Sequence, residues 1–428
     1  MIRRFSLYGF LKNQQYYDPF IILAYLQMGL NFTLIGTLIA FREIVINVAE
    51  IPTGVIADLF GRRKSMIFSF ISYIVSFSVM GTAGVVSLEN DVPVGIVFGA
   101  LMGAMVFFGI GDAFRTGTHK AMIFTWLRIQ NRTDERTKVY GYTRSWSKIG
   151  SAVSVVAASL FVFFSKNFIY IFFFSIIPYL LNIINFLGYP KEVDGDLKKG
   201  ATLSDVFQHI KATLRASLRE KKLRRLLAES MGYEGFFKAV KDYLQPILES
   251  AALPAATVLF SGLIMTNEQK SVILIGPVYL LLYTLSAYSS RRAYLFIKIS
   301  GDENSASHLL WGLLLGVLLI LIPAMYFGIT WMVICCFVIM YILQNLWRPV
   351  LMSRIDSCSD ENKGATILSI ESQAKSLSTM IIAPLIGFLV DLVSRYEIGS
   401  SEFWPLAVIG SIIAVIFFGT RRREVKAN

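Results

Sequence analysis

Residues 54–64, GVIADLFGRRK, join two long apolar stretches of the chain. The first stretch runs from Ile35 to Ile56, and the second begins at Met66. A segment needs about 20 mostly apolar residues to cross the hydrocarbon core of a bilayer. A short turn that contains glycine and carries a cluster of cations therefore indicates a cytoplasmic loop between two membrane-spanning helices.

The composition of the whole chain is typical of a multispanning membrane protein. Its 428 residues are 55% hydrophobic and 14% aromatic, and the mean hydropathy is +0.58. Only 16% of the residues are charged, whereas soluble domains average about 25%. The net charge of +12 is spread over alternate loops rather than gathered on one face, so no nucleic-acid partner is expected.

Motifs for catalysis and for bound metals are missing from the sequence. The three cysteines give no disulfide framework, and two of them, Cys335 and Cys336, lie in an apolar run. The sequence has no HExxH, GxSxG or Walker A motif and no Cys/His cluster with the spacing of metal ligands. We therefore expect no enzyme, no metal site and no cofactor.

Twelve apolar segments are predicted to span the membrane, which makes this an all-α integral membrane protein. They are Leu11–Gly29, Phe32–Ala57, Met66–Val86, Val94–Arg115 (running on towards Phe124), Val139–Phe164, Phe168–Leu187, Leu226–Leu248, Ser271–Tyr288, His308–Phe327, Trp331–Leu351, Ala365–Val390 and Phe403–Thr420. Residues 1–189 and 226–428 are predicted to form two pseudo-symmetric six-helix bundles. Residues 190–225 are predicted to form a cytoplasmic linker with an amphipathic helix at Leu203–Leu223.

Lys and Arg are concentrated in alternate loops, and this asymmetry predicts the orientation. The basic loops contain Arg62, Arg63, Lys64, Arg128, Arg132, Arg136, Lys138, Lys198, Lys199, Arg224, Arg225, Arg291, Arg292, Arg354, Lys363 and Arg421–Arg423. The intervening loops are nearly free of cations. By the positive-inside rule the basic loops and both termini are cytoplasmic, and the expected location is the plasma (inner) membrane.

The turn at residues 54–64 resembles the loop between helices 2 and 3 of the major facilitator superfamily. That family's pattern is G-x-x-x-D-x-x-G-[RK]-[RK], and Gly54, Asp58, Gly61, Arg62 and Arg63 match it, whereas the basic residue that often follows the Asp is replaced here by leucine. The resemblance implies two six-helix bundles, a central site and alternating access. It also implies that Asp58, Arg62 and Arg63 close the cytoplasmic side, with Gly54 allowing close helix packing and Gly61 making the tight turn.

Two short patterns recur in the same order in the two predicted halves. Asp112-Ala-Phe-Arg115 in the fourth span is matched by Asn345-Leu-Trp-Arg348 in the tenth. Arg144-Ser-Trp-Ser-Lys148 in the fifth span is matched by Glu371-Ser-Gln-Ala-Lys375 in the eleventh. The corresponding positions favour an internal repeat, with chance similarity as the alternative. Asp112 and Arg115 are grouped with the predicted gating residues, although Arg115 and Arg348 could also be interfacial anchors.

Fourteen charged side chains fall inside the predicted spans, where each costs about 2.5–3.5 kcal/mol if it faces lipid. They are Asp18, Arg42, Glu43, Asp112, Arg115, Arg144, Lys148, Glu234, Lys238, Lys241, Asp242, Arg348, Glu371 and Lys375. Several are spaced to share a helix face, including an i, i+4, i+8 stripe of Glu234, Lys238 and Asp242. This grouping favours a water-accessible interior lined by ions over a purely structural ion network.

The residues predicted to bind a solute are Arg42, Glu43, Arg144, Lys148, Glu234, Lys238, Lys241, Arg348, Glu371 and Lys375. The carboxylates predicted as candidates for proton coupling are Asp18, Glu43, Glu234 and Glu371. Arg and Lys in the fifth and eleventh spans suit a carboxylate or phosphate. We therefore expect a monomeric secondary active transporter of a small anionic or zwitterionic organic solute. Its expected partners are that solute, protons and the bilayer. The alternative is an exporter of drugs, lipophilic cations or lipids with the same fold.

The predicted topology is testable with reporter fusions. Fusions after Asn31 and Asn90 should report a non-cytoplasmic position, and a fusion after Asn428 should report a cytoplasmic one, because the basic loops alternate with loops nearly free of cations. Paired phosphatase and fluorescent-protein reporters provide the measurement. A non-cytoplasmic reading at Asn428 would contradict the even number of spans.

Overall fold

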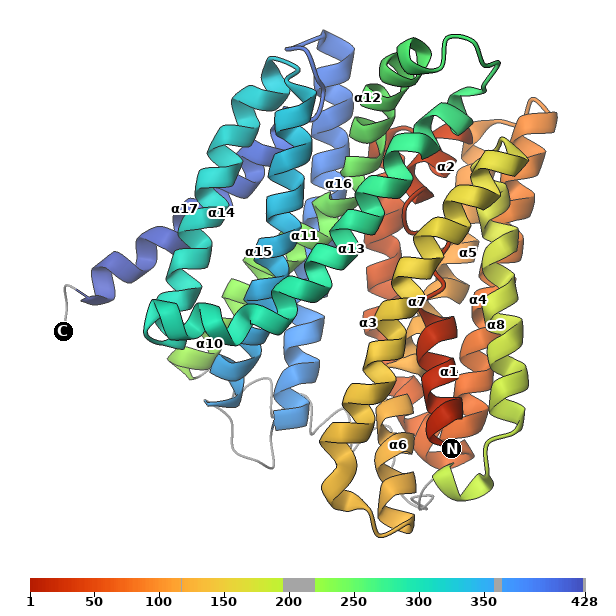
Figure 1. Ribbon diagram of the computed structural model, residues 1–428, viewed down its shortest axis with the longest axis vertical. Coiled ribbons are helices and arrows are strands. Elements are labelled where there is room, and N and C mark those ends of the chain that lie inside the picture. Colours follow the sequence, from red (N-terminus) through yellow and green to blue (C-terminus); the bar gives the residue numbers. More distant parts are fainter. Residues whose placement is uncertain (117, 195–219, 358–363, 426–428) are drawn as a thin grey trace. The chain divides into compact units, whose positions relative to one another are not determined.

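The structure is a computed structural model that describes residues 1–116, 118–194, 220–357 and 364–425 (Figure 1). These residues are helical almost throughout and contain no strand. Nine helices in the described ranges are long and apolar enough to cross a membrane. The predicted all-α membrane fold is therefore confirmed.

The helices in the first part of the chain follow the predicted second to sixth spans closely, but not the first. They are α1 (Ile2–Lys12), α2 (Ile21–Gln27), α3 (Phe32–Phe60), α4 (Arg62–Glu89), α5 (Val94–Arg115), α6 (Thr118–Ile129), α7 (Arg136–Ser165) and α8 (Tyr170–Leu187). Two short 3₁₀ turns, η1 (Thr133–Glu135) and η2 (Lys191–Asp194), lie before α7 and after α8.

The remaining described helices begin at Lys221, within the last residues of the predicted linker. They are α10 (Lys221–Ser230), the π-helical turn η3 (Met231–Gly235), α11 (Phe236–Val240), the 3₁₀ turn η4 (Lys241–Tyr243), α12 (Leu244–Leu259), α13 (Asn267–Ser300), α14 (Glu303–Tyr326), α15 (Thr330–Asp356), α16 (Gly364–Tyr396) and α17 (Trp404–Val425). Most of the amphipathic run predicted at Leu203–Leu223 lies outside the described residues.

The chain packs into two compact units. Unit 1 comprises Met1–Leu30, Phe41–His209 and Ala256–Leu280, and unit 2 comprises Asn31–Ala40, Ile210–Ala255 and Leu281–Asn428. Each unit thus includes a short segment from the other predicted half, because α3 and α13 each contribute to both. The division into residues 1–189, 190–225 and 226–428 stays a prediction.

The first and seventh predicted spans are interrupted rather than continuous. In Leu11–Gly29, helix α1 ends at Lys12 and α2 begins only at Ile21. Pro19 lacks a backbone N–H and disfavours helical geometry at the residue before it, which keeps the intervening segment out of a helix. In the seventh span η3 and η4 interrupt the helix, and Pro246 cannot donate the backbone bond that would continue it through η4.

The fourth span runs on through Phe124 as predicted, since the apolar segment Val94–Ile129 includes both α5 and α6, although Thr116, extended at φ −61° and ψ 123°, ends α5. Another boundary differs from the predicted one. Arg291 and Arg292, predicted to lie in a loop, lie inside α13. Long helices can project beyond the bilayer, so hydropathy marks the apolar core of a helix but not its ends.

Unit 1 is held together by an aromatic core and by close helix contacts. Helix α4 packs against α5 and α8, and the ring of Tyr73 stacks on Tyr179 with centroids 4.6 Å apart. Helix α1 packs against α7, where a Cβ on Gly9 would lie 2.9 Å from the Thr143 carbonyl oxygen. This close approach explains why a glycine stands at that position.

Unit 2 has a second aromatic core beside the π-helical turn. Helix α14 packs against α15 and α17, and α16 packs against η3. The ring of Trp347 is fully buried and lies parallel to Tyr233, with centroids 4.3 Å apart. Trp311 meets both rings edge to face, so three large aromatic side chains enclose the turn.

Candidate functional site

The π-helical turn η3 places Glu234 in the interior of unit 2, where its side chain is 7% exposed. Such turns often mark functional sites, because they shift one side chain out of the regular helical register. A Cβ on Gly235 would lie 2.6 Å from the Ser378 Cβ, so the absence of a side chain lets α16 approach the turn. The Thr379 hydroxyl donates a hydrogen bond to the Gly235 carbonyl at 3.1 Å.

Arg348 on α15 joins two carboxylates that are distant in the sequence. Its Nη1 donates to Glu234 Oε2 at 2.9 Å and to Glu371 Oε1 at 2.6 Å, and its Nη2 donates to Glu371 Oε2 at 3.1 Å. Glu371 is fully buried and also accepts a hydrogen bond from Ser230. The fork of the guanidinium therefore binds one carboxylate with both arms and a second with one arm.

Lys375 completes an ion quartet, which we define as Glu234, Arg348, Glu371 and Lys375. Its Nζ lies 3.4 Å from Glu234 Oε2 and 4.0 Å from Glu371 Oε2, as the i, i+4 spacing on α16 predicts. The two cations balance the two carboxylates. The side chain of Arg348 is 34% exposed and that of Lys375 is 21% exposed, so a solute can reach the cations while the carboxylates stay buried.

Polar atoms beside the quartet lack hydrogen-bond partners in the described part of the chain. These atoms are Glu234 Oε1, Tyr233 Oη, Trp311 Nε1 and Trp347 Nε1. Their side chains are buried, and an unmade hydrogen bond at such a place costs about 1–3 kcal/mol. The quartet thus has unused hydrogen-bonding capacity at its inner edge, which water or a solute could satisfy.

Unit 1 contains a second charged cluster around Asp112 and Arg115 of α5. Arg115 donates to the Asp112 carboxylate, and the Tyr73 hydroxyl donates to Asp112 Oδ1 at 2.5 Å. Lys12 interacts electrostatically with Arg115, Asp112 and Arg144. Three basic side chains and one carboxylate thus belong to this cluster.

Some of the other predicted site residues form ion pairs. Arg42 Nη2 lies 3.2 Å from Glu43 Oε1, and its guanidinium lies 5.6 Å from the centre of the Phe108 ring. Lys241 Nζ lies 2.6 Å from Asp242 Oδ1. The side chains of Arg144 and Lys148 are exposed, whereas those of Asp18 and Lys238 are intermediate. The stripe of Glu234, Lys238 and Asp242 does not follow one regular helix, because η4 interrupts it.

The GVIADLFGRRK turn adopts the geometry expected of a tight turn. Gly61 has φ +97°, which glycine adopts without strain, and α4 begins at the next residue. Arg63 donates its backbone N–H to Asp194 Oδ1 at 2.6 Å, and its Nη1 donates to the Tyr189 carbonyl at 3.0 Å. Arg62 Nη1 donates to the Thr125 hydroxyl at 2.9 Å.

For two of the matching residues, Gly54 and Asp58, the predicted role stays a prediction. Gly54 is exposed, and a Cβ there would meet no described atom within 4 Å, so its predicted packing role stays a prediction. Asp58 lies in α3, and its side chain is outside the described part of the structure. The gating roles of Asp58, Arg62 and Arg63 likewise stay predictions.

The sequence analysis missed Asp391, which binds the first residues of α3. Asp391 on α16 accepts hydrogen bonds from the backbone N–H groups of Phe32 and Thr33 at 3.0 and 2.7 Å, and from the Thr33 hydroxyl at 2.5 Å. A Cβ on Gly387 would lie 2.6 Å from the Phe32 carbonyl carbon, so the two helices touch backbone to backbone. The only sequence feature at this position was a single acidic residue directly after the predicted eleventh span.

A buried ion pair in unit 2 was also missed. Arg354 on α15 donates two hydrogen bonds to Glu229 on α10, at 2.6 and 3.2 Å. The Ser307 hydroxyl donates to Glu229 at 3.2 Å, and Asn304 accepts from Arg354 at 3.0 Å. Both charged side chains are at least 90% buried and well satisfied, which is typical of a structural pair. Sequence position suggested only that Arg354 belonged to a basic loop.

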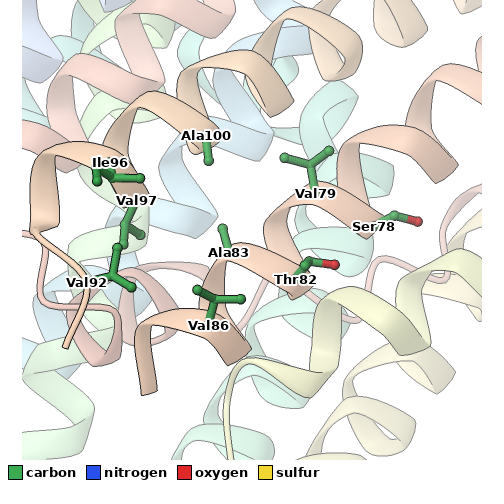
Figure 2. Close-up of a pocket in the computed structure, with 9 residues that line it drawn as sticks. All are labelled: Ser78, Val79, Thr82, Ala83, Val86, Val92, Ile96, Val97 and Ala100. Carbon is green, nitrogen blue, oxygen red and sulfur yellow. The ribbon is translucent and has the colours of Figure 1, made fainter. Parts of the chain in front are cut away.

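A separate apolar groove between α4 and α5 does not suit a charged solute. Figure 2 shows its lining residues, which are Ser78, Val79, Thr82, Ala83, Val86, Val92, Ile96, Val97 and Ala100. Its volume is about 350 Å³. The only polar side-chain atoms in this lining are two hydroxyl groups, so nothing here would balance a charge.

The sequence and the fold were then compared with known proteins. A family model described as Major Facilitator Superfamily matches residues 13–370. No curated protein matches the chain.

Solved structures share its fold over nearly the whole chain. A mutant of the nucleoside transporter NupG is 11% identical, with a TM-score of 0.75 and 98% of both chains covered. The inward-open xylose transporter XylE from E. coli is 14% identical, with a TM-score of 0.64 and coverage of 97% of this chain and 95% of that chain. A POT family transporter in complex with 5-aminolevulinic acid is 13% identical, with a TM-score of 0.67 and coverage of 97% and 94%.

The buried pair gives a prediction about stability. Replacing Glu229 with alanine should destabilise the protein by about 3–5 kcal/mol, because the Arg354 guanidinium would stay buried without its carboxylate. Thermal melting of the purified protein in detergent provides the measurement. The double variant Glu229→Ala, Arg354→Met should recover part of the loss, since no ion is then left unpaired. An unchanged melting temperature in the single variant would contradict the structural role.

Proposed function

The chain belongs to the major facilitator superfamily, and we propose that it carries a small anionic or zwitterionic organic solute by alternating access coupled to protons. It is a multi-pass membrane protein and a transporter rather than an enzyme. The family and the neighbouring folds support secondary transport in general. The substrate class and the coupling ion are the parts that we propose.

The ion quartet is the observation that carries the proposal. Arg348 is shared by Glu234 and Glu371, and Lys375 lies within 4.0 Å of both carboxylates. A solute carboxylate or phosphate that bound Arg348 and Lys375 would compete with the two glutamates for the same donors. A displaced glutamate would lose its counterion in a buried place, where it is more stable after taking up a proton. Solute binding and protonation would thereby be linked.

The cations of unit 1 support the same class of solute. The basic side chains of Lys12, Arg115 and Arg144 outnumber the Asp112 carboxylate within one electrostatic cluster, and such side chains bind anionic groups by charge-assisted hydrogen bonds. Arg144 and Lys148 have exposed side chains, so both can reach a solute. An arginine can bind a carboxylate or phosphate with two parallel hydrogen bonds.

The runner-up function, export of lipophilic cations, drugs or lipids, receives less support. A cationic solute would need a buried carboxylate without a counterion. Glu234 and Glu371 both accept hydrogen bonds from Arg348, and Glu43 lies 3.2 Å from Arg42. Each of these carboxylates therefore already has a cation beside it.

The contact between α3 and α16 supports alternating access. Asp391 binds the N-terminal residues of α3, and a Cβ on Gly36 would lie 2.8 Å from the Ala383 carbonyl carbon. The cations of the basic loops lie away from this end of α3, next to its other end at Arg62. We therefore assign Asp391 to a gate on the non-cytoplasmic side, which must release α3 when that side opens.

Substitution of Lys375 and Lys148 tests the substrate class. Lys375→Ala and Lys148→Ala should each weaken binding of the transported anion by about 1.5–3 kcal/mol, the usual value for a hydrogen bond to a charged group. A thermal-shift screen of the purified protein against carboxylates, phosphorylated compounds, zwitterions and lipophilic cations identifies the ligand, and titration then gives the affinities. Lys138→Ala, an exposed lysine near the start of α7, is the matched control.

Proteoliposomes loaded with a pH-sensitive dye test the proton coupling in the same preparation. Addition of the solute should move protons in the wild type, and Glu371→Gln should abolish that movement while solute exchange continues. Full activity of both lysine variants, or stabilisation by lipophilic cations alone, would overturn the anion assignment.

Asp391→Ala should favour opening on the non-cytoplasmic side, because loss of a helix-capping carboxylate costs about 0.5–2 kcal/mol. We expect a cysteine introduced at the fully buried Ala383, in a background without native cysteines, to react roughly two- to thirtyfold faster with an aqueous thiol reagent. Asp302→Ala is the matched control, because Asp302 caps the N-terminus of its own helix, α14, through the Ser305 N–H at 2.8 Å. Equal labelling rates in Asp391→Ala and the wild type would contradict the gate.

A further inference from the structure

A groove between α1 and α7 in unit 1 has a charged end and an apolar floor. The two helices pack against each other and lie side by side (Figure 1). The groove has a volume of about 380 Å³ and is lined by Arg3, Ser6, Leu7, Phe10, Tyr142 and Trp146. It thus combines a cation, a hydroxyl group, two amphipathic aromatic rings and apolar side chains in one place.

The polar end of the groove is available to a ligand. Arg3 is exposed, and no ion pair or side-chain hydrogen bond is found for it among the described residues. Ser6 is 5% exposed, and its hydroxyl oxygen has no hydrogen-bond partner in the described ranges. The first turn of α1 contains no acidic residue. A negatively charged group with several acceptor oxygens would satisfy both side chains.

The apolar part of the groove continues along the whole length of α7. One face of that helix exposes large apolar or aromatic side chains at helical spacing, namely Tyr142, Trp146, Ile149, Val153, Val156, Leu160 and Phe164. Tyr and Trp are enriched where the hydrocarbon core of a bilayer meets its headgroups. The order along α7 is therefore two interfacial aromatic rings first, then aliphatic side chains, with Phe164 at the far end.

We infer that this groove binds an anionic phospholipid. The phosphate lies at Arg3 and Ser6, and one acyl chain follows Leu7, Trp146 and the apolar face of α7. The charge at one end and the long apolar surface beyond it match the two parts of a phospholipid. A free phosphate would use only the polar end, and an apolar peptide would leave Arg3 without a counterion. The inference concerns lipid binding alone and does not depend on the transported solute.

Native mass spectrometry of the full chain in detergent tests the affinity and the headgroup preference. Phosphatidylglycerol should bind more tightly than phosphatidylcholine with identical acyl chains, and Arg3→Gln should weaken phosphatidylglycerol binding about fivefold, the effect of one cation near a membrane surface. Ser6→Ala should weaken it as well. Arg128→Gln is the matched control, because Arg128 is an exposed arginine on a different helix, α6. This variant should leave the affinity unchanged.

Fluorescence quenching locates the acyl chain independently. Phosphatidylglycerol with brominated acyl chains should quench part of the tryptophan emission, and that part should be missing in Trp146→Phe. Three results would overturn the inference: equal binding of the two lipids, an equal loss in Arg128→Gln and Arg3→Gln, or quenching that persists in Trp146→Phe. Competition by inorganic phosphate as effective as that by phosphatidylglycerol would identify a free-anion site instead and would also overturn it.

Discussion

The shared hydrogen bonding of Arg348 is the interaction on which the interior of unit 2 depends. One guanidinium bonds Glu234 on the π-helical turn and Glu371 on α16, and Lys375 approaches both carboxylates. The two carboxylates share these cations as hydrogen-bond donors and counterions, so loss of either cation would leave both carboxylates less well bound. Helices in a membrane gain little from burying apolar side chains against each other, because lipid tails are equally apolar. Ionic contacts and close backbone packing at Gly235 therefore hold this region together.

Exposure separates the ion networks that can act on a solute from those that only support the fold. Glu229 and Arg354 are buried on all sides and their hydrogen bonds are made within the protein. Arg348, in contrast, is one-third exposed and already shared between two acceptors. A new anion can compete for Arg348 without first breaking into the core, whereas it cannot reach Arg354. The same distinction applies in unit 1, where Arg144 is exposed while Asp112 is satisfied by Arg115 and Tyr73.

Interrupted helices supply the geometry that a regular helix cannot. The first span of each predicted half is broken, between α1 and α2 and again at η3 and η4. Inside a bilayer such breaks are tolerated only where the freed backbone groups are buried in protein or face water. At η3 the break moves Glu234 towards α15 and α16, and Thr379 satisfies the Gly235 carbonyl. The irregular backbone and the charged site therefore occur at the same place for a physical reason.

The sequence by itself determined the membrane class, nearly all of the helices and the family, because hydropathy, loop charge and the GVIADLFGRRK turn are local properties. It also predicted Glu234, Arg348, Glu371 and Lys375 as site residues, since ions in apolar spans are costly wherever they lie, and the structure brings these four side chains together. The tertiary structure alone decided which groups each charged side chain contacts. Asp391 binds an N–H group 358 positions earlier in the chain, and Asp194 binds the turn at Arg63. Neither partner could be predicted, because a carboxylate's hydrogen bonds depend on how helices pack, and packing is not written in the local pattern of one segment.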